Sequence, residues 1–276
     1  MLLWGLSWSN AKILGQYHPP TTIMFWRFLF ATLTLIPFLF IIKFDRYKLK
    51  SEFPKLLIAS IIFCLYNFFY FKGTQLGYAG IGGVLVTTLM PIITTLLSIF
   101  LYKKRIQLNI KIGILIGLVS AILLLRIWKY NLNDLINSGN IYFILGAIFW
   151  SILTLLTHSI TKMIPSLIYS AFLFSISTVI ILFSTPKSLD INFFQSSLYF
   201  WIHFISISIG AMAFGTVAYF YATQKLGATL ASSFTFLVPV SAIFFSIILL
   251  NEIPDIISTI GCITAVLSVF IINKRT

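Results

Sequence analysis

YFKGTQ at residues 70–75 and YFYATQ at residues 219–224 are two copies of one signature in this chain of 276 residues. A proline follows each copy inside the next apolar run, Pro91 after the first copy and Pro239 after the second. The copies begin 149 positions apart and the prolines lie 148 positions apart, so the two halves correspond with a shift of one residue. Duplicated membrane units of this kind are typical of secondary transporters, whose substrate binds at the interface between the copies.

Long apolar runs fill the chain around these signatures. Hydrophobic residues make up 59% of the sequence and charged residues 9%, with a mean hydropathy of +1.01. Because a helix needs about 20 apolar residues to cross a bilayer, we predict an all-α membrane protein with ten transmembrane helices and no attached soluble domain. The predicted spans are residues 2–16, 20–42, 55–72, 79–101, 108–128, 139–160, 165–184, 198–222, 227–250 and 255–273. The first span is short and starts at once after Met1, which we interpret as a start assigned too late or a clipped N-terminus.

The position of the basic residues explains the formal net charge of +13. With the N-terminus in the cytoplasm, the inner loops and the C-terminal tail hold Lys43, Arg46, Lys48, Lys50, Lys55, Lys103, Lys104, Arg105, Lys111, Lys162, Lys225, Lys274 and Arg275, whereas the outer loops hold Lys72, Arg126, Lys129 and Lys187. This positive-inside bias predicts a multi-pass protein of the cell (inner) membrane with both termini cytoplasmic. Scattered loop cations form no binding stripe for an anionic polymer. We therefore expect a small-molecule substrate and the lipid bilayer as partners, no nucleic acid, and a monomer or a homodimer.

The same threading predicts the relation between the halves, residues 1–131 and residues 139–276. Each half has five spans, so the second half enters the membrane upside down. Lys103-Lys104-Arg105 after the fourth span then lies inside, whereas the matching Asn251-Glu252-Ile253 after the ninth span lies outside. Charge asymmetry between matched loops is expected of inverted repeats. We predict two inverted five-helix repeats around a central cavity.

No motif in the sequence points to an enzyme. The chain has no Walker A loop, no HExxH and no GxSxG motif. Cys64 and Cys262 lie singly inside predicted spans, where cysteine commonly packs as a small hydrophobe. The three histidines lack the spacing of metal ligands. We expect no catalytic residue, no metal and no cofactor.

The acidic residues all fall in predicted loops or at the ends of spans. They are Asp45, Glu52, Asp134, Asp190, Glu252 and Asp255. A carboxylate in mid-membrane usually serves a proton relay or a cation site. The lack of one disfavours a proton-driven exporter of organic cations.

Several short stretches, in a fixed order, carry a resemblance to a known family. They are Leu3-Trp4-Gly5 through Lys12, Arg27-Phe28 after Pro19-Pro20, Gly215-Thr216 before Tyr219-Phe220, Leu226-Gly227-Ala228, Pro239, and Asn251-Glu252. With these stretches the chain resembles the EamA-like permeases of the drug/metabolite transporter superfamily over nearly its whole length. The resemblance implies ten helices in two inverted repeats around a cavity, and transport of small metabolites, many of them amino acids, usually outward. The chain departs from the family at Lys104, which replaces the acid that typically ends the fourth span, while Glu252 keeps that acid after the ninth.

The candidate substrate-binding residues are aromatic side chains on the helices that line the cavity in the resembled family, and polar side chains within the spans. They are Trp4, Trp8, Asn10, Lys12, Tyr66, Asn67, Tyr70, Thr87, Trp150, Tyr219, Ser232 and Thr235. Each polar residue in this set has an alternative role in bonding a neighbouring helix, which is worth about 0.6–2 kcal/mol.

The cations and histidines within the spans have competing interpretations. Lys12 either extends its ammonium to the headgroups or faces the cavity and attracts an anionic group. Arg27 lies about seven residues into its span, and we favour a structural role with its guanidinium on backbone carbonyls or polar groups of the outer loops. His158 occupies the place in the sixth span that Lys12 has in the first, and packing is favoured over a protonic function. His203 is expected at the membrane interface.

The matched prolines predict hinges, because a proline removes one backbone hydrogen bond and lets a helix bend. With Pro91 and Pro239 as hinges, we predict an exporter of small metabolites such as amino acids that works by alternating access. The alternatives are a sugar-phosphate or nucleotide-sugar type antiporter, which would need at least two cations in its cavity, and a membrane protein without transport activity.

Overall fold

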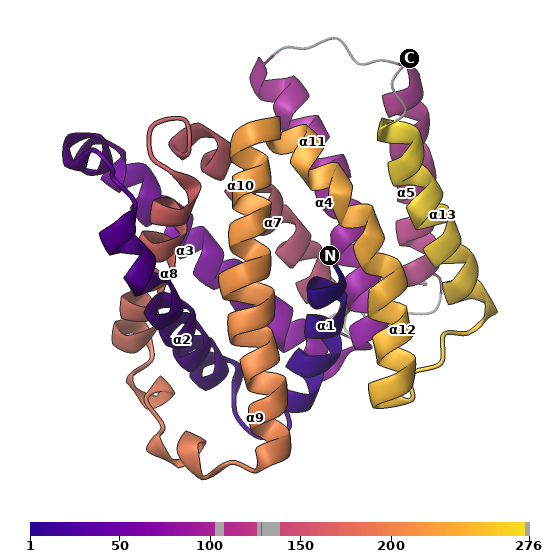
Figure 1. The fold of residues 1–276 in the computed structure, drawn as a ribbon. Helices are drawn as coiled ribbons and strands as arrows, with labels where there is room; N and C mark the ends of the chain where they lie inside the picture. The colour runs from indigo at the N-terminus through magenta and orange to yellow at the C-terminus, as the bar shows by residue number, and fades with distance from the viewer. Residues whose placement is uncertain (103–107, 126–127, 129–138, 274–276) are drawn as a thin grey trace.

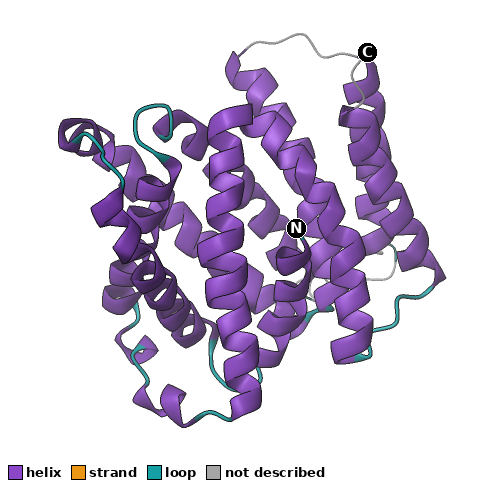
Figure 2. Ribbon diagram, viewed as in Figure 1, coloured by secondary structure: helices purple, strands orange, loops and turns teal. Residues whose placement is uncertain are grey.

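The computed structural model describes residues 1–102, 108–125, 128 and 139–273. Within these residues the chain is helical and contains no strand (Figure 2). The first half forms α1 (Leu2–Leu14), α2 (Pro20–Ile41), α3 (Arg46–Leu76), α4 (Ala79–Tyr102) and α5 (Leu108–Leu125). The second half begins with α7 (Asn140–Ile160) and α8 (Ser166–Ser184), followed by the short η1 (Pro186–Ser188) and η2 (Ile191–Gln195).

Two long rods and one further helix complete the second half. The first rod consists of α9 (Leu198–Ile205), the π-helix η3 (Ser206–Thr216) and α10 (Val217–Leu226). The second rod consists of α11 (Ala228–Ser233), the 3₁₀ turn η4 (Phe234–Leu237) and α12 (Val238–Leu250). The last helix is α13 (Ile256–Asn273).

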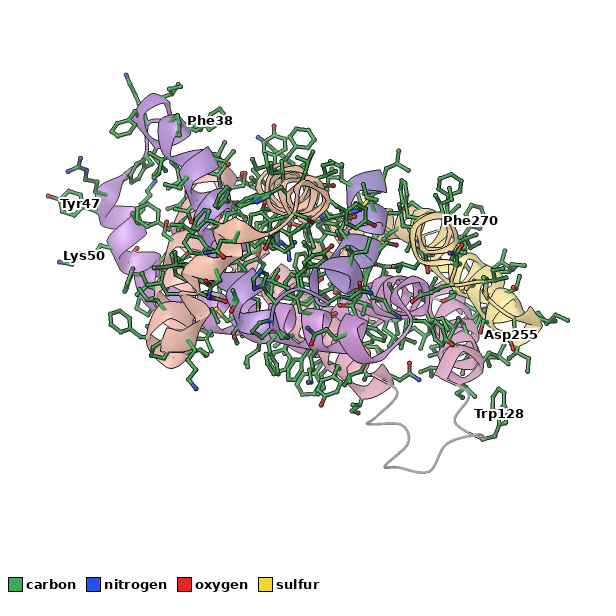
Figure 3. The ribbon with its side chains drawn as sticks, turned by 90° about the horizontal axis from the view of Figure 1, so that it is seen from below. Phe38, Tyr47, Lys50, Trp128, Asp255 and Phe270 are labelled. Carbon is green, nitrogen blue, oxygen red and sulfur yellow. The ribbon has the colours of Figure 1, made fainter. Side chains whose placement is uncertain are left out.

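The helices have the length and the surface of membrane spans. Among the described residues, six helical stretches are long and apolar enough to cross a bilayer, and three shorter apolar helices accompany them. Large apolar side chains remain exposed on the periphery, such as Phe38 at 44% and Phe270 at 62% of their full area (Figure 3). Exposed apolar residues on this scale indicate a surface that faces lipid rather than water. The prediction of an all-helical, multi-pass membrane protein is therefore confirmed.

The boundaries of several spans differ from the prediction. The first helix ends at Leu14 rather than at residue 16. The third helix begins at Arg46 rather than at residue 55, because the Asp45 carboxylate accepts hydrogen bonds from the backbone N–H groups of Tyr47 and Lys48. This N-cap satisfies donors that the first turn would otherwise leave unpaired, so a segment predicted as a loop is helical.

Two internal departures from α-helix were not predicted from the sequence. Residues 206–216 form the π-helix within the predicted eighth span, and residues 234–237 form the 3₁₀ turn within the predicted ninth. The turn directly precedes Pro239, which falls in the first helical turn of α12. Proline is tolerated in a first turn because its missing N–H would have had no helical partner. In contrast, α4 runs on through Pro91 without a break.

Figure 1 shows α2, α3 and α8 on one side of the bundle and the pair α5 and α13 on the other. Between them α1 packs against α12, α12 against α4, and α4 against α7. Small residues allow these close approaches. A Cβ on Gly83 of α4 would lie 2.5 Å from the Cβ of Ala242 on α12, and a Cβ on Gly5 of α1 would overlap Ser241.

The duplicated signature makes the same contact in each half. The side-chain amide of Gln75 donates to the carbonyl of Gly15 at the end of α1, and that of Gln224 donates to the carbonyl of Thr161 at the end of α7. The hydroxyl of Tyr70 bonds to α1 and the hydroxyl of Tyr219 bonds to α7. Each copy therefore attaches the third helix of its half to the first.

Some sequence-based expectations fall outside the described residues. They concern Lys103, Lys104, Arg105, Arg126, Lys129, the first-half boundary at 131, Asp134, Lys274 and Arg275.

Candidate functional site

A small cavity lies where the two halves meet. Its walls come from α1, α2, α3 and α4 of the first half and from α7 and η3 of the second. Seven of the predicted substrate-binding residues line it: Trp4, Trp8, Tyr66, Asn67, Tyr70, Thr87 and Trp150. Its volume of about 30 Å³ has room for one or two water molecules. A metabolite would therefore require the walls to move apart.

An aromatic cluster forms one side of this cavity. The ring centroids of Trp4 and Trp150 lie 5.3 Å apart in an edge-to-face arrangement, and both rings contact Tyr219 at 5.0 and 5.7 Å. Tyr66 packs on Trp150 with centroids 4.4 Å apart, and Trp8 packs edge-to-face on Tyr70 at 4.6 Å. Residues from α1, α3, α7 and α10 thus build one continuous aromatic surface from both halves.

The π-helix η3 turns backbone carbonyls toward this cavity. The indole N–H of Trp4 donates to the carbonyl of Ala211 at 3.1 Å, and the guanidinium of Arg27 donates through Nε to the carbonyl of Ile207 at 3.3 Å. Thr216, the last residue of η3, lines the cavity and also donates to the Ala211 carbonyl. π-Helices are rare in proteins, and those that occur often lie at functional sites. The presence of η3 is therefore a second reason, besides the aromatic walls, to regard the cavity as a functional site.

Arg27 is the one charged residue in the described lining of the cavity. Its side chain is 7% exposed and donates through Nη1 to Oδ1 of Asn67 at 2.9 Å. The guanidinium lies over the rings of Tyr70 and Phe71, 5.7 and 5.5 Å from their centroids. The predicted bond to a backbone carbonyl is present, but the polar partner is Asn67 of α3 rather than an outer loop. Sequence reasoning did not place Arg27 among the substrate-binding residues. The feature of the sequence that could have identified it is its position about seven residues inside the predicted span.

Two buried donors in this region differ in their hydrogen bonding. Trp4 uses its indole N–H, as described above, whereas the indole N–H of Trp150 has no hydrogen-bond partner of good geometry among the described residues, although the Tyr219 hydroxyl is nearby. Buried donors are nearly always satisfied in proteins. An unsatisfied one in a cavity wall is available to a ligand.

The other predicted site residues lie away from the cavity lining. Asn10 bonds to Ser206 at 3.0 Å and to Nδ1 of His203 at 2.8 Å. Thr235 donates to the carbonyl of Thr87 at 3.1 Å and so joins η4 to α4, and Ser232 bonds within its own turn. His203 is buried against α1, where Asn10 satisfies its ring nitrogen; its expected place at the level of the membrane interface stays a prediction.

Lys12 lies in a separate group, which we call the Glu252 cluster: Lys12, Gly80, Ser246 and Glu252. The ammonium of Lys12 is 2.5 Å from Oε1 of Glu252 and donates to the carbonyl of Gly77 at 2.8 Å. The other carboxylate oxygen, Oε2, accepts from the backbone N–H of Gly80 at 3.2 Å and from the hydroxyl of Ser246 at 2.5 Å. This cluster joins the end of α1, the start of α4 and the end of α12.

A second cavity, of about 310 Å³, adjoins the Glu252 cluster. Gly77 and Tyr78 of the first half line it, together with Asn140, Glu252 and Asp255 of the second half. It contains none of the predicted substrate-binding residues.

At the same end of the bundle, the turn between α1 and α2 contacts the connection between α8 and α9. His18 bonds through Nε2 to Ser196 at 2.9 Å, and its Nδ1 lies 3.7 Å from Oδ2 of Asp190. Burial lowers the pKa of His18 below its usual value, and the nearby Asp190 opposes that shift. This loop contact is separate from both cavities.

Comparison with known proteins gives a consistent result. The model of the EamA-like transporter family matches residues 1–126 and 137–274. An uncharacterized transporter of Synechocystis, sll0355, is 25% identical over 99% of this chain and 87% of its own length. The uncharacterized transporter YetK of Bacillus subtilis is 25% identical over 100% and 85%, and a WAT1-related chloroplastic protein of Arabidopsis thaliana is 26% identical over 96% and 66%. One solved crystal structure aligns at a TM-score of 0.70 and 16% identity over 98% of this chain and 94% of that chain, which shows a shared fold.

The contrast between the two tryptophans predicts a difference in stability. Trp4→Phe and Trp150→Phe remove the same side-chain volume, but only Trp4→Phe removes the donor to the Ala211 carbonyl. We expect Trp4→Phe to destabilise the protein by about 1 kcal/mol more than Trp150→Phe, measured as the lower apparent melting temperature in detergent. Equal melting temperatures would contradict the assignment of these two indole groups.

Proposed function

Because the chain belongs to the EamA-like transporter family, we propose that this membrane transporter is an exporter of small metabolites, such as amino acids, that binds them in the central cavity. The observation that carries the proposal is the aromatic surface of Trp4, Tyr66, Trp150 and Tyr219, because both halves of the chain contribute to it. A site built at such an interface changes its exposure when the halves move relative to one another.

Reciprocal packing supports two inverted five-helix repeats of residues 1–131 and 139–276. The contact of α1 with α12 has its counterpart in the contact of α7 with α4. The contact of α3 with α7 has its counterpart in the contact of the π-helix rod with α1, and the pairs α2–α8, α4–α12 and α5–α13 each join matched helices. Together with the duplicated signature, these pairs favour ten spans related by a two-fold axis in the membrane plane.

Charge supports a cell-membrane location with both termini cytoplasmic. Among the described residues, the expected inner side carries Lys43, Arg46, Lys48, Lys50, Lys55, Lys111, Lys162 and Lys225, and the expected outer side carries Lys72 and Lys187. In this orientation the Glu252 cluster lies at the outer end of the bundle.

The proposed mechanism is alternating access, in which the Glu252 cluster holds the outer end closed. The carboxylate of Glu252 is the centre of the closure because it binds Lys12 and Gly80 of the first half and Ser246 of the second. Opening toward the outside requires these bonds to break. Pro91 and Pro239 are proposed hinges for that movement, since Pro239 follows a 3₁₀ turn and Pro91 removes a backbone bond in α4.

The alternative of a sugar-phosphate or nucleotide-sugar type antiporter is less well supported. That function needs at least two cations in the cavity. Arg27 lines the cavity, but Lys12, the other candidate, is paired with Glu252 at the end of the bundle.

Transport by the purified protein tests the proposal. In proteoliposomes preloaded with amino acids, we expect counterflow of at least one radiolabelled amino acid, reduced at least tenfold by Trp150→Ala because the aromatic surface is lost. Phe270→Ala removes an aromatic ring that is exposed on the periphery and is expected to transport normally. No counterflow with any amino acid, or equal loss in both variants, would refute the proposal.

Breaking the Glu252 cluster should open the outer end. In a protein with Cys64 and Cys262 replaced by alanine, a cysteine at Ser7 in the cavity wall reports access. We expect Lys12→Met and Glu252→Gln each to raise its modification rate by an impermeant reagent from outside about tenfold, because loss of one partner of this partly buried ion pair favours the open state. Glu52→Gln removes the partner of Lys55 and is the matched control. If the rate is unchanged in both cluster variants, the closure is located elsewhere.

The paired prolines predict opposite effects on the same reporter. Because the proposed repeats are inverted, Pro91→Ala and Pro239→Ala should each slow transport and shift access to the cysteine at Ser7 toward opposite faces. Modification rates in right-side-out and inside-out vesicles measure the two shifts. Shifts in the same direction, or unchanged transport, would mean that the prolines are packing features.

A further inference from the structure

Arg27 is a buried cation without an anionic partner in the part of the chain that the structure describes. Among the described residues the ion pairs are Lys12 with Glu252, Lys55 with Glu52, and His18 with Asp190. Arg27 is 7% exposed and lies within α2, away from all three pairs. An arginine within a membrane span is expensive and is a functional-site candidate by default.

The neighbours of Arg27 satisfy only part of its hydrogen-bonding capacity. A guanidinium has five N–H donors. Two of them are used, by the carbonyl of Ile207 and the side-chain oxygen of Asn67. Tyr70 and Phe71 contact the guanidinium through their rings. Donors of the second terminal nitrogen, Nη2, have no partner among the described residues, and the side chain lines the cavity.

The cavity wall is positively charged at Arg27 and becomes apolar and aromatic with distance from it. The guanidinium lies over Tyr70, the ring of Tyr70 stacks with Tyr66 at 6.0 Å, and Tyr66 packs on Trp150 at 4.4 Å. One end of this row is therefore positive and the other is apolar and aromatic. A molecule that complements the whole row has an anionic group at one end and an apolar body at the other.

The cavity favours a single negative charge over two. Apart from Arg27 its described lining consists of uncharged side chains: aromatic, aliphatic, thioether, hydroxyl and amide. A carboxylate matches the guanidinium with two parallel hydrogen bonds. A phosphate dianion would leave one charge without a partner in a poorly solvated site.

We propose that Arg27 binds the carboxylate of the transported molecule, and that the substrates are monocarboxylates with an apolar or aromatic body placed against Tyr66 and Trp150. This assignment rests on the proposed transport function and names its substrate class. It also explains why Arg27, a residue of the cavity lining, has donors that no described residue of the chain uses.

Binding of three probes to the purified full-length protein tests the assignment. The probes are 3-phenylpropionate, its uncharged amide, and phenyl phosphate, and the readout is quenching of the fluorescence of the cavity tryptophans. We expect the wild-type protein to bind the carboxylate about 10- to 100-fold more tightly than the amide, as for a charged hydrogen bond in a buried site, and more tightly than the phosphate. Equal affinity for carboxylate and amide, tighter binding of the phosphate, or no binding of the carboxylate would overturn the assignment.

Variants of Arg27 locate the preference. Arg27→Met should bind the carboxylate and the amide equally, and Arg27→Lys should keep a reduced preference because a lysine lacks the planar fork. Arg46→Met makes the same substitution at an exposed arginine and should leave the preference unchanged. A carboxylate preference that persists in Arg27→Met would refute the role of Arg27. If Arg27→Met does not insert, the comparison of probes on the wild-type protein and on Arg27→Lys still decides.

The counterflow and probe-binding experiments together distinguish a failure of the Arg27 assignment from a failure of the proposed transport function. Amino-acid counterflow together with equal binding of carboxylate and amide would leave the transporter in place and remove the role of Arg27. Absence of counterflow together with a carboxylate preference that depends on Arg27 would refute the transport function and retain the binding site.

Discussion

A buried donor in a membrane protein has no water to replace a missing partner, and the centre of this structure is organised by that constraint. Arg27 and Trp4 both carry N–H groups into the core of the bundle. Carbonyls of the π-helix η3 accept from both side chains, at Ile207 and Ala211. The irregular backbone of η3 is thus located where side chains need acceptors. Among the described residues, the indole N–H of Trp150 makes no hydrogen bond of good geometry and Arg27 uses two of its five donors; both residues line the cavity.

The first helix of each half is the common element to which the other parts attach. Gln75 and Gln224 bind the C-terminal carbonyls of α1 and α7, and Tyr70 and Tyr219 bind the same helices further along. Through α1 and α7 the aromatic surface of the cavity is therefore coupled to the ends of the bundle. α1 itself carries both Lys12 of the Glu252 cluster and Trp4 and Trp8 of the cavity wall. A movement of α1 that opens the cluster would therefore also move the wall of the proposed site.

Much of the fold could be predicted from the sequence. An apolar run of about 20 residues is long enough to cross a bilayer. In lipid a helix satisfies the backbone N–H and C=O groups of such a run from within the run itself, whichever helices pack around it. Features that depend on neighbouring residues can also be predicted from the sequence. The Asp45 cap that starts α3 is an example, because its partners are two and three positions away. The first part of this helix, residues 46–54, was predicted as a loop because it is rich in polar residues. The aromatic candidates on α1, α3 and α7 were predicted because these helices line the cavity in the resembled family, and seven of the predicted residues line the cavity here.

The sequence by itself determined the all-helical membrane class, and it contains the repeated signature and two cations within the apolar runs. Only the tertiary structure decided what the cations contact. Lys12 pairs with Glu252, which is 240 positions away, and Arg27 meets Ile207, 180 positions away. Spacing along a helix gives depth and face, but the partner on that face comes from another helix. The packing of α1 on α12 and of α2 on η3 therefore assigned Lys12 to the end of the bundle and Arg27 to the cavity.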